Sequence, residues 1–323
     1  MKIGIIGAAK IAGKVAPALA AIPEIQCYAV ASRSLEKAEE FARQYGFEKA
    51  YGSYEAMLRD PEVELVYVAT PHSHHYEHMM LCIAYGKHII CEKAFTLNAD
   101  QARKIREAAA QKGVYVAEAI WTRYMPSRHV IQKVLESGII GKPNTLTANL
   151  SYVIGNVPRI VEPELAGGAL LDIGVYGLNF SMMHFGTDIE RVDTAVQMTE
   201  KGVDAMEVIT LFYRDGRMAV LTHSVWCRSD RKGIIHGDKG YMVVENINNP
   251  QSLKVYDTED VLLEEYDFSD QINGYEFEFQ EAVRCIREGK LESDSMPMAD
   301  TVAVMAFMDS LRKGWGVVYP QER

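Results

Sequence analysis

The first fifteen residues constrain the fold of this chain more than any other stretch. Lys2–Ile6 is a short apolar run typical of a buried strand, and a tight turn that opens a helix follows it. In such a strand–turn–helix unit, one glycine permits the turn and later small residues allow a phosphate and the helix to approach closely. The phosphate then binds the N–H groups at the helix N-terminus. The stretch predicts dinucleotide binding, although small residues at such a turn also serve packing alone. The residues that would bind the phosphates are Gly7, Ala8, Ala9, Lys10 and Ile11, with Ala12 packing the helix.

Composition narrows the classes of protein to consider. The chain has 323 residues, 48% hydrophobic and 24% charged, which is typical of a soluble globular protein of about two domains. A net charge of −10 argues against nucleic acid as a partner. Five scattered cysteines with no C-x-x-C pair indicate neither a disulfide framework nor a zinc site, and they favour a reducing compartment. With no signal peptide and no apolar run near ~20 residues, we expect a cytoplasmic protein without a membrane partner.

Strands and helices alternate along the first third of the chain. The predicted strands are 3–6, 26–31, 65–69, 88–91 and 115–119, and the predicted helices are 12–21, 35–45, 54–58, 76–85 and 99–112. This alternation predicts an α/β domain with a doubly wound parallel sheet over residues 1–120. Ligands of such sheets bind beyond the carboxyl ends of the strands, so the residues after each strand deserve the closest inspection.

The order of predicted helices and strands changes from about Trp121. One helix, 127–137, precedes a series of strands at 145–152, 189–199, 205–213, 218–226, 232–236, 241–245 and 252–256. Arg214-Asp215-Gly216 between two of them is a hairpin signal. Two helices, 275–288 and 299–313, end the chain. Successive strands predict an antiparallel sheet in an α+β domain over residues 121–323.

The second predicted strand ends at a basic and hydroxylated turn. Ser32 and Arg33 follow Ala31, and Lys37 lies one turn further on. An NAD site usually places a carboxylate here to bind the ribose 2′-hydroxyl, and none is present. Ser32, Arg33 and Lys37 therefore favour the 2′-phosphate of NADP over NAD, and the alternative is a solvated basic helix start with no ligand.

Residues 70–78 hold four histidines in seven residues. The spacing of His74 and His78 admits a metal site, but no well-placed carboxylate or cysteine completes one, so we expect no metal. Thr70 and Pro71 end a strand and precede a helix, and with His72 and His75 they are expected to line the nicotinamide side of a cofactor cleft.

Glu92 and Lys93 follow the next buried strand. Most lysines are solvated, but a lysine at the carboxyl end of a central parallel strand lies where ligands bind. There its ammonium group can hydrogen-bond a substrate hydroxyl and favour the deprotonated form.

Taken together, these motifs resemble the Gfo/Idh/MocA family of NAD(P)-dependent oxidoreductases over essentially the whole chain. The resemblance rests on Gly7-x-Ala9-x-x-Ala12, Ala69-Thr70-Pro71, His75, Gly86-Lys87-His88, Glu92-Lys93, Gly113 and the run from Gly167 to Tyr176. The run from Glu118 to Pro126 is most similar to the dihydrodiol dehydrogenase and glucose–fructose oxidoreductase branch. The resemblance implies a Rossmann domain and an α+β domain with a large, mostly antiparallel sheet, whose open face commonly forms a homodimer.

Two positions differ from the usual pattern of that family. Ala94 replaces the proline of Glu-Lys-Pro, which puts the rigidity of the loop in question more than the chemistry. Tyr176 stands where the family often has histidine, and the dihydrodiol and glucose–fructose branch resembles this chain in using tyrosine.

The resemblance assigns the catalytic roles to Lys93, Asp172 and Tyr176. Asp172 and Tyr176 are four residues apart, on one face if residues 170–180 are helical. Tyr176 would be the general acid/base, its pKa lowered from about 10 by Lys93 and the oxidised nicotinamide. Asp172 would orient the substrate or hold Lys93 charged, and Asn179 would reach the same pocket. The alternative is a buried helix in which Asp172 stabilises the N-terminus.

Three further residues are candidates for binding. Trp121 and Arg123 follow the last strand of the first domain, where they could line the crevice for cofactor and substrate. Arg159 lies in a loop that borders the substrate pocket or is solvated.

The sequence thus predicts hydride transfer between NAD(P) and a carbinol carbon of a small molecule, a sugar, polyol or vicinal diol. Two alternatives stay open. One is a regulator that binds NAD(P) without catalysis, and the other is an enzyme that oxidises its substrate transiently without net redox change.

Overall fold

The computed structural model describes residues 1–323 as two compact units. Unit 1 comprises Met1–Tyr124 and Ile272–Asp309, and unit 2 comprises Met125–Gln271 and Ser310–Arg323. The functional division at residue 120 remains a prediction. The segment Ile272–Asp309 belongs to unit 1 by its contacts, because its helix Glu276–Arg287 packs on the helix Lys10–Ala21 and on the parallel sheet.

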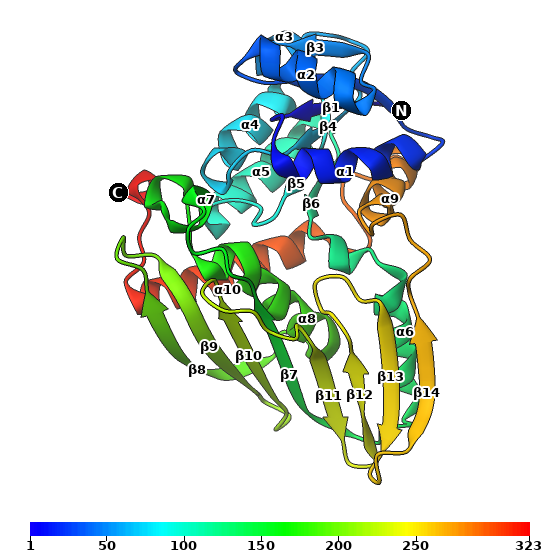
Figure 1. The fold of residues 1–323 in the computed structure, drawn as a ribbon. Coiled ribbons are helices and arrows are strands. Elements are labelled where there is room, and N and C mark those ends of the chain that lie inside the picture. The colour runs from blue at the N-terminus through cyan, green and yellow to red at the C-terminus, as the bar shows by residue number, and fades with distance from the viewer. The chain divides into compact units, whose positions relative to one another are not determined.

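Unit 1 is built on a six-stranded parallel sheet with the order β3-β2-β1-β4-β5-β6 (Figure 1). The strands are β1 Lys2–Ile6, β2 Gln26–Ala31, β3 Lys49–Tyr51, β4 Leu65–Val68, β5 His88–Glu92 and β6 Val116–Ala119. The helices are α1 Lys10–Ala21, α2 Leu35–Tyr45, α3 Tyr54–Leu58, α4 His72–Ala84, α5 Ala99–Lys112 and α9 Glu276–Arg287, with the short turn η1 Trp121–Arg123. This strand order is that of a Rossmann fold, as predicted.

Burial of apolar strands on both faces holds unit 1 together. Strands that are buried on both faces consist mostly of apolar residues. In β1 and β4, for example, the side chains of Ile3, Ile5 and Tyr67 are fully buried. Phe279 of α9 packs edge-on against Tyr67, with ring centroids 5.4 Å apart. Each such side chain stabilises the folded state by about 1.5–3 kcal/mol through its removal from water.

Two predictions about elements need correction: β3 was missed because it has three residues, and α4 begins at His72 rather than at residue 76.

Unit 2 is built on an eight-stranded sheet with the order β14-β13-β12-β11-β7-β10-β9-β8. Only β7 and β10 pair in parallel, and the other neighbours are antiparallel. The strands are β7 Pro143–Ser151, β8 Ile189–Met198, β9 Asp204–Tyr213, β10 Met218–Ser224, β11 Gly233–Gly237, β12 Gly240–Val244, β13 Ser252–Asp257 and β14 Leu262–Asp267. This confirms the predicted mostly antiparallel sheet, and the predicted hairpin joins β9 to β10 with Gly216 at φ 87°. Strand β14 was missed, since it is mostly exposed and carries consecutive acidic residues.

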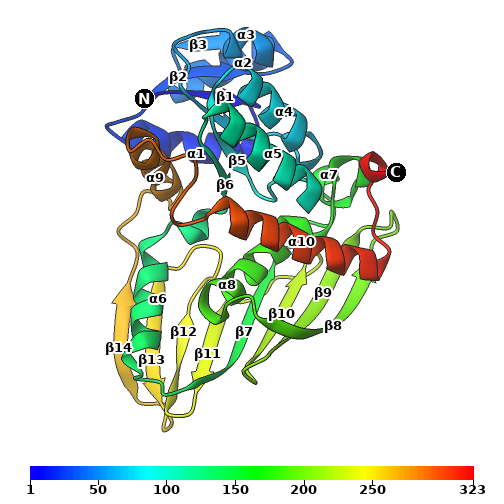
Figure 2. The ribbon, with the colours of Figure 1, turned by 180° about the vertical axis from the view of Figure 1, so that it is seen from behind.

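Helices cover one face of this sheet. The helices of unit 2 are α6 Pro126–Ser137, α7 Pro158–Val161 and α8 Val175–Phe185, with short turns at η2 Pro163–Leu165, η3 Leu170–Gly174 and η4 Pro320–Glu322. Helix α10, Met298–Trp315, precedes η4. Figure 2 shows α6 and α8 across one face, and Figure 1 views the opposite face, where no helix lies. None of the helices combines the length and the apolar character that a membrane span requires.

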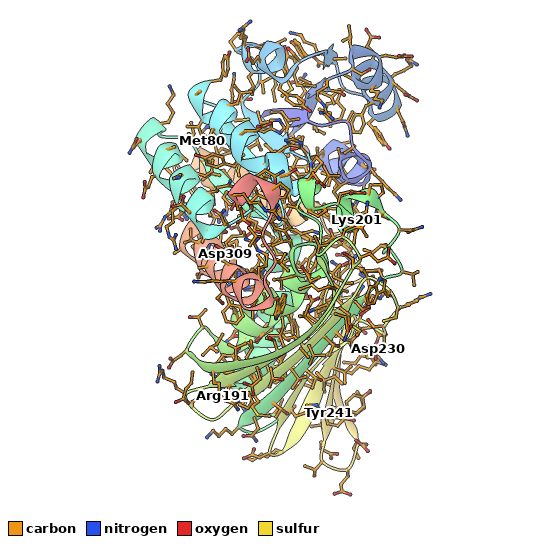
Figure 3. All side chains as sticks on the ribbon, turned by 90° about the vertical axis from the view of Figure 1, so that its left-hand side faces the viewer. Met80, Arg191, Lys201, Asp230, Tyr241 and Asp309 are labelled. Carbon is orange, nitrogen blue, oxygen red and sulfur yellow. The ribbon has the colours of Figure 1, made fainter.

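The uncovered face of the sheet carries large side chains. The guanidinium of Arg191 on β8 lies 3.6 Å from the ring centroid of Phe212 on β9. Tyr241 on β12 stacks between His236 and Tyr256, at 5.8 and 5.0 Å between centroids. Arg191 and Tyr241 are labelled in Figure 3. This face is therefore aromatic and partly apolar, unlike a fully solvated sheet face.

One carboxylate ties the edge of the parallel sheet together. Asp60 Oδ2 accepts hydrogen bonds from Tyr28 Oη at 3.0 Å, Lys49 Nζ at 2.7 Å and Tyr51 Oη at 2.6 Å. Burial opposes ionisation of Asp60, but the donors Lys49 and Tyr51 outweigh it and hold its pKa well below the ordinary value.

We expect Asp60→Asn to lower the free energy of unfolding at pH 7 by about 1–3 kcal/mol, because hydrogen bonds to a charged acceptor are lost. Stabilisation by a depressed pKa is complete above the unfolded pKa of about 3.9 and is lost as pH falls through the folded pKa. The difference from wild type should therefore be smaller at pH 3 than at pH 7 in urea denaturation. Glu40→Gln, at an exposed carboxylate on α2, is the control. A difference that does not change with pH would contradict the assignment.

Candidate active site

The turn after β1 is shaped to accept an anion. Gly7 has φ 101°, and a Cβ there would lie 3.1 Å from Thr70 Cγ2 and 3.2 Å from the carbonyl oxygen of Ala69. Ala9 is the N-cap of α1, no side chain caps that helix, and its first turn has no acidic residue. The N–H groups of a helix end without a side-chain cap favour a phosphate. The residues present therefore fit the pyrophosphate of a dinucleotide.

The sequence analysis missed one close contact beside this turn. A Cβ at Gly13 would lie 2.5 Å from Tyr45 Oη, so α1 and α2 approach closely at Gly13. Ala12, which was expected to pack the helix, is fully buried in the core of unit 1.

Polar groups follow β2 at the same edge of the sheet. Ser34 caps α2, where its Oγ accepts the N–H of Lys37 at 3.3 Å, and Ser32 Oγ accepts the N–H of Ser34 at 3.3 Å. Arg33 and Lys37 are exposed. The charge of Arg33 acts on Tyr54 and His78, which places these three side chains near one another.

The histidines of α4 contact each other and their neighbours through their rings. His78 Nδ1 lies 2.9 Å from Thr70 Oγ1, and the His78 ring meets Tyr54 at 4.7 Å and His74 at 5.8 Å between centroids. Burial first, and then the charges of His74, His75 and Arg33, lower the pKa of His78 to about 4. His78 is therefore a neutral side chain at physiological pH.

The loop that carries Lys93 is fixed by histidines of the first turn of α4. His72 Nε2 lies 3.1 Å from the carbonyl oxygen of Lys93, and His75 Nδ1 lies 3.0 Å from that of Ala94. His75 Nε2 also lies 2.7 Å from the carbonyl oxygen of Thr70, which joins the loops after β4 and β5. Burial lowers the pKa of His75 to about 4, so the imidazole is neutral and its single N–H donates to one of these two carbonyl oxygens. The loop thus keeps its position without the proline of the family pattern.

Buried carboxyl groups lie beneath this loop. Glu118 on β6 accepts the N–H of Phe95 at 3.2 Å, and burial raises its pKa to about 7 although Thr301, Arg123 and Lys93 oppose that shift. Glu92 accepts a hydrogen bond from Tyr67, and burial followed by the charge of Glu92 raises the pKa of Glu278. The sequence analysis expected Glu92 at the site but gave no role to Glu118 or Glu278.

Trp121 and Arg123 have contacts within unit 1. The indole of Trp121 stacks on the Tyr275 ring at 4.1 Å between centroids and 10° between planes. Arg123 Nη1 lies 3.2 Å from Asp300 Oδ2, with 4% of the residue exposed. These contacts hold both side chains in place, and their roles toward cofactor and substrate stay predictions.

In unit 2, Asp172 lies in an unusual turn, and Tyr176 lies in the first turn of the helix that follows it. Leu170–Gly174 is a π-helical turn that leads into α8, so the expected α-helix over 170–180 is corrected in its first half. Such turns are frequent at functional sites. Asp172 is 5% exposed and accepts a charge-assisted hydrogen bond from Arg159 Nη1 at 2.5 Å. Asp172 does not cap α8, because the N-cap is Gly174 and no side chain caps that helix.

The other predicted residues of this segment are also buried. Tyr176 is 7% exposed, and Asn179 is fully buried, with its Nδ2 donating to the carbonyl oxygen of Val175 at 2.9 Å. Unit 2 therefore joins Arg159 to Asp172 by an ion pair and places Tyr176 and Asn179 on the adjoining helix.

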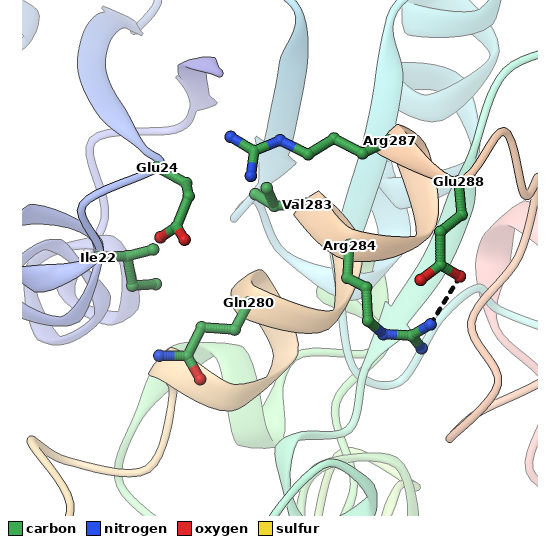
Figure 4. A pocket seen from close by; sticks show the side chains of 7 residues that line it. All are labelled: Ile22, Glu24, Gln280, Val283, Arg284, Arg287 and Glu288. Carbon is green, nitrogen blue, oxygen red and sulfur yellow. Dashed lines mark hydrogen bonds and ion pairs between the residues drawn. The ribbon is translucent and has the colours of Figure 1, made fainter.

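The pocket drawn in Figure 4 is a separate feature. It has a volume of about 520 Å³ and is lined by Ile22 and Glu24 after α1 and by side chains from Gln280 to Glu288 around α9. Glu24 precedes β2, so this pocket lies at the amino edge of the parallel sheet. Ligands of doubly wound sheets bind at the carboxyl edge, and the pocket has no place in the candidate site.

Comparison with known proteins identifies the family. Residues 1–119 match the oxidoreductase family with an NAD-binding Rossmann fold, and residues 129–243 match the GFO/IDH/MocA C-terminal domain. The chain is 33% identical to trans-1,2-dihydrobenzene-1,2-diol dehydrogenase of Mus musculus over 333 aligned residues, which cover 100% of this chain and 99% of that protein.

Solved structures share the fold. A 3-ketoreductase from Actinomadura kijaniata in complex with NADP and TDP-benzene has a TM-score of 0.89 at 24% identity, covering 97% of each chain. Levoglucosan dehydrogenase in complex with NADH has a TM-score of 0.86 at 20% identity, covering 98% of this chain and 97% of that one. The chain therefore belongs to the Gfo/Idh/MocA family of oxidoreductases and is a nicotinamide-dependent enzyme that acts on CH–OH groups.

Proposed function

We propose that this oxidoreductase transfers a hydride between NADP(H) and a carbinol carbon, and that a vicinal diol is the first substrate class to test, ahead of sugars and polyols. The observation that carries the proposal is the placement of Lys93 after β5, at the same carboxyl edge of the sheet as the uncapped N-terminus of α1. The full-length similarity to a dihydrodiol dehydrogenase supports the diol.

The first unit supplies the groups for the cofactor. The turn from Gly7 to Ile11 would hold the pyrophosphate, and Ser32, Arg33 and Lys37 would hold the 2′-phosphate. The proposed nicotinamide side consists of Thr70, Pro71, His72, His75 and Glu92, with Trp121 and Arg123 as further contacts. When bound, the nicotinamide supplies the hydride acceptor or donor. Exposure of Arg33 and Lys37, and the lack of a carboxylate after β2, support NADP over NAD.

Side chains of the protein would transfer the proton of the substrate hydroxyl. Tyr176 would take the proton from the substrate hydroxyl in oxidation and return it in reduction. The ammonium group of Lys93 would hydrogen-bond the same oxygen and stabilise its negative charge as the proton leaves. Asp172, fixed by Arg159, would orient the hydroxyl, and Asn179 would complete the substrate contacts. Burial of Asp172 and Tyr176 supports this role, because electrostatic interactions strengthen where water is excluded.

The assembly and the compartment are part of the same proposal. We infer a homodimer formed by the uncovered sheet face of unit 2, supported by its half-exposed Met206, Val208 and Phe212. Large apolar side chains gathered on one face favour burial against a partner. We infer a cytoplasmic location, supported by five cysteines that are all free thiols.

A substrate screen tests the proposed function directly. Vicinal diols, sugars and inositols would be offered with NADP⁺ and NAD⁺, and cofactor reduction would be read by absorbance. Stoichiometric NADP(H) binding without turnover would favour a regulator instead. Product formed without net cofactor reduction would favour transient oxidation.

Lys93→Met should lower kcat by about 10²–10⁴-fold, because the hydrogen-bond donor to the reacting oxygen is removed. The dissociation constant for NADP(H), measured by fluorescence titration, should change little. Lys112→Met, at an exposed position in α5, is the matched control. Wild-type kcat in Lys93→Met would remove Lys93 from the mechanism.

Tyr176→Phe should also lower kcat by about 10²–10⁴-fold, because only the phenolic proton carrier is lost. The pH profile of kcat in the oxidation direction should lose the limb assigned to the phenol. Tyr266→Phe, at a half-buried position in β14, should keep the wild-type profile. A profile that is unchanged in Tyr176→Phe would assign the proton transfer to another group.

Arg33→Ala should weaken NADPH binding by roughly 10- to 100-fold, the equivalent of about 1.5–3 kcal/mol for a hydrogen bond between charged groups. NADH binding should change far less, because NADH has no 2′-phosphate. Calorimetric titration of both cofactors against wild type, Arg33→Ala and the control Arg43→Ala measures this difference. Equal weakening of NADPH and NADH would overturn the proposed preference.

A further inference from the structure

Three ionisable side chains are buried in unit 2 and have no part in the proposed chemistry. Asp204 and Glu207 lie on β9 and His223 lies on β10, with at most 1% of any of them exposed. Glu207 and His223 are opposite each other in the antiparallel register, and His223 Nδ1 lies 3.2 Å from Glu207 Oε1. All three point to the sheet face that packs against α8 and the preceding π-turn.

Each of these side chains lies directly under a glycine. A Cβ at Gly168 would be 2.4 Å from Asp204 Oδ1, and one at Gly174 would be 2.7 Å from Glu207 Oε1. A Cβ at Gly177 would be 2.2 Å from His223 Nε2. Contacts this short do not occur for real Cβ atoms, so any larger residue would displace either the backbone or the polar side chain.

Asp204 also makes a hydrogen bond to the backbone at the start of the π-turn. Asp204 Oδ2 accepts the N–H of Leu170 at 2.6 Å. Leu170 is the first residue of the π-turn, and Asp172 and Tyr176 follow within the stretch bounded by Gly168 and Gly177. The backbone that carries both proposed site residues therefore rests on these three buried side chains.

Burial sets the charge of the cluster. It raises the pKa of Glu207 well above the ordinary value and lowers the pKa of His223 to about 3. Burial raises the pKa of Asp204 to about 7, against the N–H of Leu170 and the charge of Arg312. Glu207 and His223 therefore face each other as a neutral acid and a neutral imidazole, which avoids the cost of two buried charges.

We propose that Asp204, Glu207 and His223 are positioning residues that form a polar platform for the π-turn bearing Asp172 and for the start of α8 bearing Tyr176. The glycines of this motif serve close packing on that platform. The proposal rests on the proposed function for its catalytic readout, but not for its structural one. A displacement of reacting groups by about 1 Å can cost 10²-fold in rate, so the platform acts through geometry.

A double-mutant cycle tests the contact between Gly177 and His223. Gly177→Ala should lower kcat by about 10- to 100-fold and increase hydrogen exchange of the amides in residues 170–179, with little change in the KM for the cofactor. Adding His223→Ala should restore most of both losses, because the imidazole that the methyl group meets is gone. Gly314→Ala, at an open position in α10, is the control and should leave both readouts at wild-type values.

Substitution of Glu207 separates polarity from packing. Glu207→Gln should keep kcat and exchange near wild type, because the amide keeps the size and polarity of the side chain under Gly174. Glu207→Leu, of similar size, should lower kcat and loosen the same amides. Equal behaviour of the two variants, or independent effects of Gly177→Ala and His223→Ala, would overturn the proposal. If wild type turns over no substrate, the proposed function fails, and the exchange measurements alone decide about the platform.

Discussion

The organisation of both units depends on glycines, which have no side chain and let the backbone approach neighbouring groups closely. In unit 1, Gly7 lies against the backbone of Ala69 and the methyl group of Thr70, so the loops after β1 and β4 pack together beside the uncapped end of α1. In unit 2, Gly168, Gly174 and Gly177 allow a helix and its leading turn to rest on buried polar side chains. The same steric device thus shapes a place for an anion in one unit and a fixed turn in the other.

The fold was largely predictable because its signals are local. Alternating apolar runs and helical patterns predicted the Rossmann unit, and the run of strands after residue 145 predicted the antiparallel sheet. The failures have physical reasons. Strand β3 is too short to show a period, and β14 alternates exposed and half-buried residues without an apolar face. The π-turn at Leu170–Gly174 depends on contacts with β9 that lie more than thirty residues away in sequence.

The candidate site was predictable only in part. Position after a strand made Lys93 a candidate, the family resemblance made Asp172 and Tyr176 candidates, and their roles stay predictions. Neither source predicted which groups would hold them. His72 and His75 were expected to face the cofactor, and the structure shows their ring nitrogens on the backbone of the Lys93 loop. Glu118, Asp204, Glu207 and His223 look like ordinary strand residues in the sequence, and only burial and tertiary contact distinguish them.

The way the Lys93 loop is fixed has a consequence for protein engineering. The carbonyl oxygens of Lys93 and Ala94 contact the imidazoles of His72 and His75 on α4. The shape of the loop therefore depends on α4 as much as on its own residues. A designer who transplants the segment from β5 to Phe95 into a different scaffold would need to carry the first turn of α4 with it. Without those two imidazoles, the transplanted loop would lose the contacts that the carbonyl oxygens of Lys93 and Ala94 make here.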